Sequence, residues 1–313
     1  MINKFKLAMI GGRGYVGQEV ISILNNHPNF ELEKVFSKST FDTPVKGYKK
    51  SLNLTYSKLE NTCPVLDGVH IVVMALANNE SKKYVHMIEK NYPNIIFIDI
   101  SSDHRFDTKW SYRIPELSSS KATNFISNPG CYASAIQFSL EPIKKIISGR
   151  VSSFGISGYS GAGASPNDKN NPDKLENNVI PYSLSGHTHE LEVARYCYQN
   201  ISFSPHVGNF FRGILITSHI KLIDVFEVDG ILSIFKNYYK ECPLISVLDE
   251  IPMINDVANK HVVHVGGITL DKTGENLTVC CALDNLLKGA ATQTIQNLNS
   301  ACGLSELTGL NYE

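Results

Sequence analysis

The chain has 313 residues, of which 42% are hydrophobic and 19% charged, and its formal net charge is −1. A chain of this length buries enough apolar surface to fold without disulfides or a structural metal, and length alone favours about two domains. The balanced charge excludes a strongly basic protein, so we expect neither nucleic acid nor a membrane as a partner.

The first half of the chain alternates strand-like and helix-like segments. Apolar runs predict strands at 5–10, 31–36, 69–77 and 95–100. After the first run, apolar residues recur at helical spacing, at Val16, Val20, Ile23 and Leu24. The last two runs are almost continuously apolar, as is typical of parallel strands that are covered on both faces. We therefore expect an α/β fold with a doubly wound sheet and right-handed crossovers.

A glycine-rich turn follows the first predicted strand. Gly11, Gly14 and Gly17 form the pattern G-x-x-G-x-x-G at the start of a helix. Glycine tolerates a positive φ and lets the backbone approach a pyrophosphate, which the helix N-terminus attracts. The placement between strand and helix favours dinucleotide binding. An ordinary tight turn is the alternative.

The end of the second strand indicates which dinucleotide binds. An NAD-binding fold usually has Asp or Glu here, bonded to the ribose 2′-hydroxyl. In this chain Ser37, Lys38 and Ser39 follow Phe36 instead. Hydroxyls and a cation suit a 2′-phosphate, so we expect NADP. The alternative is that Lys38 is only a solvated loop charge.

Cys131 follows the turn sequence Asn128-Pro129-Gly130 and lies just before an apolar run at 133–147. This places the thiol at a helix N-terminus, which favours the thiolate. A helix end contributes at most about 2 kcal/mol, so a nucleophilic cysteine here also needs a histidine partner. An inert role in the core is the alternative, and it is our interpretation of the remaining cysteines, Cys63, Cys197, Cys242, Cys280, Cys281 and Cys302.

Two histidines and a glutamate supply the candidate partner. His187 and His189 are two residues apart, and Glu192 lies one turn beyond His189 if a helix begins there. A carboxylate beside an imidazole is typical of a general acid/base. A metal site is a weaker alternative because no further ligands stand at metal spacing, and a structural helix start is another. His261 and His264 lie in a strand-like stretch and are interpreted as structural.

The second half differs in composition from the first. Residues 153–165 are rich in Gly and Ser, and residues 166–181 are polar and loop-like. Strands of a second, mixed sheet are expected at 213–222 and 277–283. Helical spacing returns at Leu287, Ala290, Ala291, Thr294, Ile295 and Leu298, and we expect this last helix to return to the first domain.

The sequence also suggests a compartment. The chain has seven cysteines, an odd number, at irregular spacing. This pattern is typical of reduced thiols rather than of a disulfide framework. No run of about 18 apolar residues predicts a membrane span. The first residues, MINKFKLAMIGG, lack the features of a signal or transit peptide, so we expect a cytoplasmic protein.

Taken together, these motifs resemble the N-acetyl-gamma-glutamyl-phosphate reductase family of arginine biosynthesis, in its fungal-type branch. The cofactor loop is Gly11-Gly12-Arg13-Gly14-Tyr15-Val16-Gly17, and the nucleophile signature is Ser127-Asn128-Pro129-Gly130-Cys131-Tyr132-Ala133. Further matches are residues 158–163, 180–184, 187–190 and 284–291. The chain departs from many members at Thr188 and Glu190, where they have Arg and Pro.

The resemblance implies a Rossmann domain and an α+β domain like that of glyceraldehyde-3-phosphate dehydrogenase. We expect residues 1–130 and 286–313 to form the NADP-binding domain. Residues 131–285 would form the catalytic and oligomerisation domain, in a homo-oligomer that is a dimer or a tetramer.

The resemblance also assigns site residues. It implies Cys131 as the nucleophile and His189 with Glu192 as the acid/base pair. Cofactor contacts are expected at Gly11, Gly12, Arg13, Gly14, Tyr15, Val16, Gly17, Ser37, Lys38, Asn285, Lys288 and Gly289. Substrate contacts are expected at Arg105, Asn128, Ser160, Gly161 and His187.

The implied reaction is the NADPH-dependent reduction of an acyl phosphate to an aldehyde through a cysteine thioester. N-acetyl-gamma-glutamyl phosphate is the expected substrate. A related reductase acting on acetyl-aminoadipyl or aspartyl phosphate is an alternative, and a non-catalytic NADP-sensing protein is a second.

Overall fold

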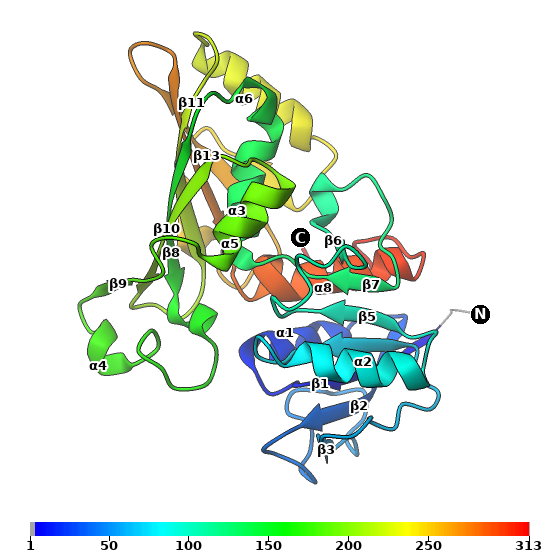
Figure 1. Ribbon diagram of the computed structural model, residues 1–313. Coiled ribbons are helices and arrows are strands. Elements are labelled where there is room, and N and C mark those ends of the chain that lie inside the picture. The colour runs from blue at the N-terminus through cyan, green and yellow to red at the C-terminus, as the bar shows by residue number, and fades with distance from the viewer. Residues whose placement is uncertain (1–3, 313) are drawn as a thin grey trace. The chain divides into compact units, whose positions relative to one another are not determined.

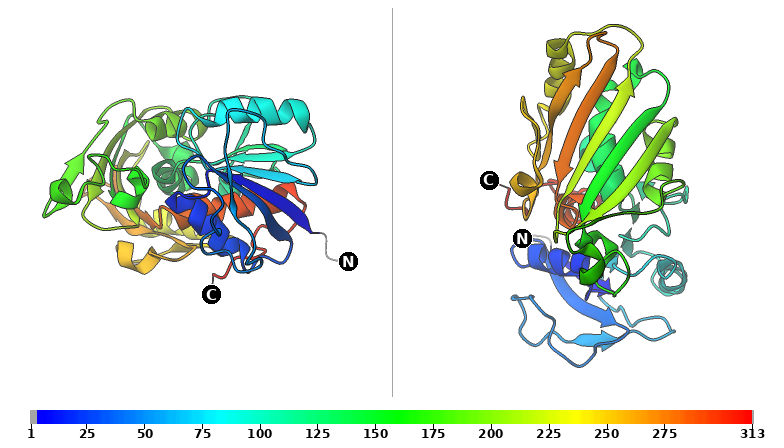
Figure 2. Two further views of the ribbon diagram at one scale, coloured as in Figure 1. Left: turned by 90° about the horizontal axis from the view of Figure 1, so that it is seen from below. Right: turned by 90° about the vertical axis from the view of Figure 1, so that its left-hand side faces the viewer.

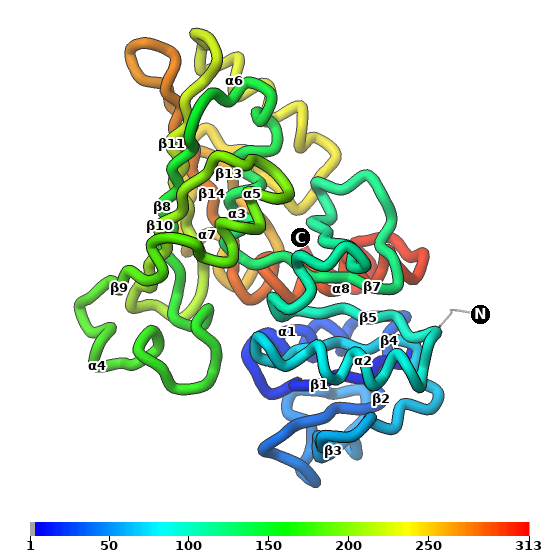
Figure 3. Tube along the Cα trace, in the orientation of Figure 1, coloured from blue at the N-terminus to red at the C-terminus, as the bar shows by residue number. Residues whose placement is uncertain are grey.

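The computed structural model describes residues 4–312 and divides into two compact units. The first unit comprises the chain up to Pro129 together with Ala290–Asn311, and the second comprises Gly130–Gly289 with the C-terminal Tyr312. The chain therefore leaves the first unit once and returns to it, as the trace in Figure 3 shows.

The first unit contains a parallel sheet with the strand order β3-β2-β1-β4-β5-β7-β6. Its strands are β1 (Phe5–Ile10), β2 (Phe30–Ser37), β3 (Tyr56–Lys58), β4 (Ile71–Met74), β5 (Ile96–Asp99), β6 (Ser111–Tyr112) and β7 (Phe125–Ser127). Neighbouring strands pair in parallel throughout. The helices of the unit are α1 (Tyr15–Leu24), α2 (Ser81–Asn91), the short 3₁₀ turn η1 (Pro115–Leu117) and α8 (Thr292–Ala301) (Figure 1). The predicted doubly wound sheet is confirmed.

The strands that were predicted as long apolar runs are shorter than expected. The run 69–77 contains only β4, because the loop after Met74 turns away to lead into α2. All four residues of β4 are buried, as a strand in the middle of a covered parallel sheet should be.

Helix α8 is buried on every side, although its sequence contains many polar residues. It packs against α1 and β5 of the first unit. Its polar side chains are bonded inside the unit: Asn297 donates to the Arg113 carbonyl, and Asn299 donates to the carbonyls of Glu306 and Thr308. The spacing of apolar residues therefore predicted the helix but not the surroundings of its polar face.

The second unit contains a mixed sheet with the order β12-β13-β14-β11-β8-β10-β9. Its strands are β8 (Val151–Gly158), β9 (Val179–Pro181), β10 (Ile201–Gly208), β11 (Ile214–Lys221), β12 (Ile245–Val247), β13 (Val263–Leu270) and β14 (Asn276–Leu283). Its helices are α3 (Cys131–Leu140), α4 (Pro172–Leu175), α5 (Thr188–Tyr196), α6 (Val228–Tyr239) and α7 (Ile254–Val257), with 3₁₀ turns η2 (Glu141–Ile146) and η3 (Tyr159–Ala162). A π-helical turn, η4 (Leu287–Ala291), precedes α8.

Helices α3, α5 and α6 pack on one face of this mixed sheet. Figure 2, right, views the sheet from the opposite face. Burial alternates along β8 from one face of the sheet to the other. Val151 and Ser153 are buried under the helices, whereas Ser152 and Phe154 are exposed on the opposite face.

Three local expectations differ from the structure. The helix that starts at Cys131 ends at Leu140, because Pro142 interrupts the pattern and the chain continues as η2. The segment expected as a loop at 166–181 contains α4 and β9. His261 lies before β13 rather than within it.

In the structure the second unit includes residues 286–289, after the end of β14. The Asp284 carboxylate accepts the N–H groups of Leu286 and Leu287, and the Asp284 carbonyl accepts the N–H of Gly289. These bonds hold residues 286–289 against the end of β14. Among residues 4–312, no helix is both long and apolar enough to cross a bilayer.

Candidate active site

The glycine turn joins β1 to α1 and leaves the start of the helix uncovered. Gly11 has a φ of 92°, and a Cβ there would lie 2.3 Å from the Ala75 carbonyl oxygen, so only glycine fits. Gly14 is the N-cap of α1, and a Cβ added to it would meet no described atom within 4 Å. The turn thus combines a tight backbone with open space at a helix N-terminus, which suits a bound phosphate group.

Two cations lie near the end of β2, but they have different partners. The Arg13 guanidinium donates to the Ser39 hydroxyl at the end of this strand. The Lys38 ammonium instead lies 2.5 Å from the Glu80 carboxylate, just before α2. Sequence reasoning missed Glu80 because it lies 42 residues from Lys38. Lys38 therefore shares its charge with a carboxylate, whereas Arg13 is bonded to a neutral hydroxyl.

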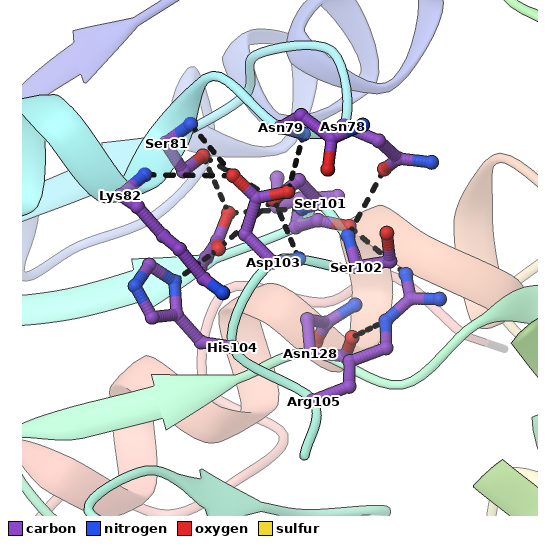
Figure 4. A network of polar contacts seen from close by, with 12 residues as sticks. Asn78, Asn79, Ser81, Lys82, Ser101, Ser102, Asp103, His104, Arg105 and Asn128 are labelled. Carbon is purple, nitrogen blue, oxygen red and sulfur yellow. Dashed lines mark hydrogen bonds and ion pairs between the residues drawn. The ribbon is translucent and has the colours of Figure 1, made fainter. Parts of the chain in front are cut away.

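Arg105 lies in a loop after β5, in a network of polar contacts that includes Ser81, Ser101 and His104 (Figure 4). The buried carboxylate of Asp99 fixes this loop. This carboxylate accepts bonds from Ser81 Oγ and from the Ser101 N–H, both at 3.0 Å. His104 Nδ1 lies 2.6 Å from its second oxygen, and the His104 ring stacks on Trp110. Asp99 therefore holds the loop at both Ser101 and His104. The sequence motif Ser-Ser-Asp-His-Arg alone did not reveal this role of Asp99.

Arg105 and Asn128, both predicted to bind substrate, lie side by side in the first unit. Arg105 Nε donates to the Asn128 carbonyl at 3.0 Å, and its Nη2 donates to the Ile100 carbonyl at 3.1 Å. The Asn128 side chain is fully buried and donates to the Ala290 carbonyl. Asn128 thus helps to fix the turn before Cys131.

Cys131 is the first residue of α3, as predicted, with Gly130 as the N-cap. The Gly130 N–H donates to Glu192 Oε2 at 2.9 Å, and the Gly130 carbonyl accepts the Ser134 N–H at 2.8 Å. The thiol is half-buried. A half-buried sulfur at a helix N-terminus is the environment in which a cysteine is both accessible and favoured as thiolate.

His187, His189 and Glu192 all belong to the start of α5. His187 is the N-cap, and its Nδ1 accepts the His189 N–H at 3.1 Å. His189 Nε2 lies 3.9 Å from Glu192 Oε1, which is an ion-pair distance and too long for a hydrogen bond. Because α3 packs against α5 and Glu192 bonds to Gly130, the first turns of these two helices lie together.

Aromatic rings enclose the imidazoles. The ring centres of His187 and His189 are 4.7 Å apart, and Tyr182 and Tyr132 lie 5.5 Å and 6.0 Å from His187 and His189 respectively. Burial raises the pKa of both tyrosines, so they stay protonated. Sequence reasoning placed Tyr182 in a family motif but gave it no role, because a single tyrosine in a loop carries no spacing signal.

The segment after β14 contains residues that were predicted to touch the cofactor. A Cβ on Gly289 would lie 2.7 Å from Cys131 Cβ, so this glycine lies directly against the cysteine. The Lys288 side chain is fully buried, with its ammonium 5.6 Å from the centre of the Phe138 ring.

Asn285 connects two predicted site segments within the second unit. Its side-chain oxygen accepts the Gly213 N–H at 2.7 Å, and its amide donates to the Ser160 hydroxyl at 2.9 Å. Ser160 is buried, whereas its neighbour Gly161 is exposed. The loop at Ser160 therefore presents backbone groups, and Asn285 holds it in place.

Comparison with known proteins identifies the family. The chain is 39% identical to an N-acetyl-gamma-glutamyl-phosphate reductase of Xylella fastidiosa, over 99% of this chain and 96% of that protein. This chain belongs to the N-acetyl-gamma-glutamyl-phosphate reductase family. It is also 39% identical to the mitochondrial protein arg11 of Schizosaccharomyces pombe, where the match covers 98% of this chain but 36% of that longer protein.

Two family models match this chain, each over a different part of it. Residues 6–125 match the semialdehyde dehydrogenase NAD-binding domain, and residues 131–285 match the semialdehyde dehydrogenase dimerisation domain. A solved aspartate semialdehyde dehydrogenase of Vibrio cholerae has the same fold, with a TM-score of 0.78 and 17% identity over 96% of this chain and 99% of that one. The predicted fold class and family resemblance are confirmed.

Within this member of the reductase family, the second unit brings Cys131, His187, His189, Glu192 and Gly289 together. The first unit separately holds the glycine turn, and also Arg105 with Asn128. Among residues 4–312, no group of three or more His, Cys, Asp or Glu side chains is arranged to hold a metal ion.

Proposed function

We propose that this protein catalyses the NADPH-dependent reductive dephosphorylation of N-acetyl-gamma-glutamyl phosphate to N-acetyl-glutamate 5-semialdehyde. The observation that carries the proposal is the identity to a named reductase along nearly the whole chain. The arrangement of Cys131 at a helix N-terminus beside the turn that contains His189 supports the same reaction.

In the proposed reaction, the Cys131 thiolate attacks the acyl carbon and the bond to the phosphate oxygen breaks, which gives a thioester and inorganic phosphate. A reduced nicotinamide, when bound, supplies the hydride that reduces the thioester carbon. Collapse of the resulting hemithioacetal breaks the C–S bond, releases the aldehyde and regenerates the thiolate. Sulfur suits both steps because it is a good nucleophile and a good leaving group.

His189 is the proposed proton carrier for these steps. Its Nε2 lies 3.9 Å from Glu192 Oε1, at the start of α5. Protonated His189 stabilises the thiolate before attack and exchanges a proton with the hemithioacetal oxygen. The exposed backbone at Gly161 is the proposed group that binds the departing phosphate, and His187 lies against His189 as a further substrate contact. Arg105, in the first unit, is also a proposed substrate contact.

The first unit provides the proposed dinucleotide site. The N-terminus of α1 at Gly14, Tyr15 and Val16 receives the pyrophosphate, and the tight packing of Gly11, Gly12 and Gly17 keeps the backbone close to it. We propose that NADP is preferred over NAD, because the Arg13 guanidinium of the glycine turn lies at the Ser39 hydroxyl, just after β2, where it can bind a 2′-phosphate.

The cofactor preference can be measured without turnover. Replacing Arg13 with Met should weaken NADPH binding in calorimetry by roughly 10-fold or more, since one charge-assisted phosphate bond is lost. Binding of NADH should change little. Lys38→Met is the matched control, and its smaller effect would follow from the ion pair with Glu80. Equal losses for NADPH and NADH would contradict a 2′-phosphate site at Arg13.

The protein is also proposed to assemble as a homo-oligomer, a dimer or a tetramer, and to work in the cytoplasm. The match of residues 131–285 to a dimerisation domain supports assembly. A reducing compartment is supported by the free thiols of its cysteines. Cell fractionation with an antibody to the protein would test the compartment.

The decisive experiment is the reverse reaction, which is phosphate-dependent reduction of NADP with N-acetyl-glutamate 5-semialdehyde. Cys131→Ala should lower turnover by at least about 1,000-fold and leave NADPH binding nearly unchanged. Normal turnover in this variant would refute the thioester route. Parallel assays with aspartate and acetyl-aminoadipate semialdehydes separate the proposed substrate from its relatives.

A further inference from the structure

Glu192 makes its hydrogen bond to the turn before the cysteine, not to the imidazole beside it. Its Oε2 accepts the Gly130 N–H at 2.9 Å, whereas its Oε1 lies 3.9 Å from His189 Nε2. The Glu192 side chain is fully buried, so water does not compete for these oxygens. A buried carboxylate that accepts a backbone N–H makes one of the stronger hydrogen bonds in proteins.

We propose that Glu192 is a positioning residue, which holds the Gly130 N–H and so fixes the direction in which α3 presents Cys131. The inference rests on the proposed role of Cys131 as the nucleophile. It differs from a role in orienting His189, because the contact that meets hydrogen-bond geometry is the one to Gly130.

The turn around Gly130 gives this single bond its importance. Pro129 has no N–H group, so Gly130 has the only backbone N–H between Asn128 and Cys131. The Gly130 carbonyl is already committed to α3, because it accepts both the N–H and the hydroxyl of Ser134. Glu192 therefore fixes the one remaining polar group of the N-cap residue, and it does so from a different helix, α5.

The packing of α3 against α5 makes this bond a link between the two proposed catalytic residues. Cys131 follows Gly130 by one residue, and His189 precedes Glu192 by one helical turn. A change in the reach of the Glu192 side chain would shift the cysteine turn relative to the turn that contains His189. Positioning errors of about 1 Å between reacting groups can lower a rate by roughly 100-fold.

Two substitutions separate the hydrogen bond from the charge. Glu192→Gln keeps the length of the side chain and an oxygen that can accept from Gly130, but it removes the charge. Glu192→Asp keeps the charge but shortens the side chain by one methylene, which takes the carboxylate away from the Gly130 N–H. Glu227→Gln, an exposed glutamate of the same unit, is the matched control.

The rate of Cys131 alkylation by iodoacetamide, followed by peptide mass mapping from pH 6 to pH 9, is the first measurement. The second is hydrogen exchange of the peptide that contains Gly130, and the third is kcat and KM in the reverse reaction. We expect Glu192→Gln to stay within about 3-fold of the wild type in alkylation and kcat, with the Gly130 amide still protected. Glu192→Asp should lose this protection and at least 10-fold in kcat, with little change in KM.

The opposite ranking, with Glu192→Asp active and Glu192→Gln impaired, would overturn the inference, because the charge would then act on His189. Wild-type behaviour of both variants, or equal impairment of both, would overturn it too. Alkylation and exchange need no substrate. A protein that shows the expected ranking in these two measurements but reduces no acyl phosphate would refute the proposed function while leaving the role of Glu192 intact.

Discussion

At the scale of single residues, the surroundings of Cys131 leave little space on the side of Gly289. A Cβ added to this glycine would lie 2.7 Å from Cys131 Cβ and 3.2 Å from the Asp284 carbonyl oxygen. The Cys131 Cβ is attached directly to the backbone of α3, and the Asp284 oxygen is itself a backbone atom, so neither can move aside without a shift of the first turn of α3 or of η4. The close contact with Cys131 therefore explains why position 289 has a residue without a side chain.

Gly289→Ala should lower kcat by roughly 10- to 100-fold, because the added methyl group displaces Cys131 from its attack position. NADPH affinity in calorimetry should be unchanged. Gly230→Ala in α6 is the control, since a Cβ there would meet no described atom within 4 Å. Alanine favours a helix interior by about 1 kcal/mol over glycine, so this control should be active and slightly more stable. Weaker NADPH binding in Gly289→Ala would instead indicate a cofactor contact.

Local spacing indicated which residues of the candidate site have reactive side chains. The turn before Cys131 and the three-residue step from His189 to Glu192 were visible in the sequence. The partners of these residues were not, because Glu192 and Gly130 are 62 residues apart and Lys38 and Glu80 are 42 apart. Pairings over such separations depend on the packing of helices, which no local pattern encodes.

At the scale of elements, His27 shows how α8 is joined to the first unit. The ring is fully buried and stacks on Phe30 at 4.0 Å. Its Nδ1 accepts the N–H of Phe30, and its Nε2 faces the Asn299 side-chain oxygen at 2.9 Å. An acceptor at Nδ1 and a donor at Nε2 require the neutral ring, and burial lowers the pKa of His27 to about 4.

This neutral histidine predicts a loss of stability in mild acid. The unfolded chain takes up the proton near pH 6.5, whereas the folded protein does so only near pH 4, so stability is complete above pH 6.5 and falls as the pH drops between these values. The loss between pH 7.5 and pH 5 should be about 2 kcal/mol in urea unfolding. His27→Gln should reduce this pH dependence, and an unchanged slope in the variant would show that His27 is not its source.

The same element shows the limit of prediction from periodicity. Apolar positions at helical steps correctly predicted a helix after residue 287, but an amphipathic pattern implies one solvated face. The polar residues of α8 are instead bonded to loops of the first unit, such as the Asn299 amide to the carbonyls of Glu306 and Thr308. Periodicity reports where apolar residues lie and not what covers the polar ones.

At the scale of the whole molecule, the mixed sheet of the second unit has a face that its helices do not cover. Adjacent strands place Ser204, Phe154 and Thr217 in one row, and His206, Ile156 and Leu215 in the next. Every one of these positions is uncharged or a histidine. Phe154 is 44% exposed, and its ring lies 4.3 Å from the His206 ring, tilted by 36°. A broad uncharged face of this kind is typical of a surface between subunits.

A second copy of the chain is the proposed partner for this face, because the matched dimerisation domain contains all of these strands. The wild-type protein should then elute in light-scattering chromatography at a multiple of its 34.7 kDa chain mass. Phe154→Glu places a charge in the middle of the face, where burial without a partner costs several kcal/mol, and should shift the protein to the mass of one chain. Ile223→Glu, an exposed apolar position after β11, is the control and should leave the mass unchanged. An oligomer that survives Phe154→Glu would mean that the subunits meet through a different surface.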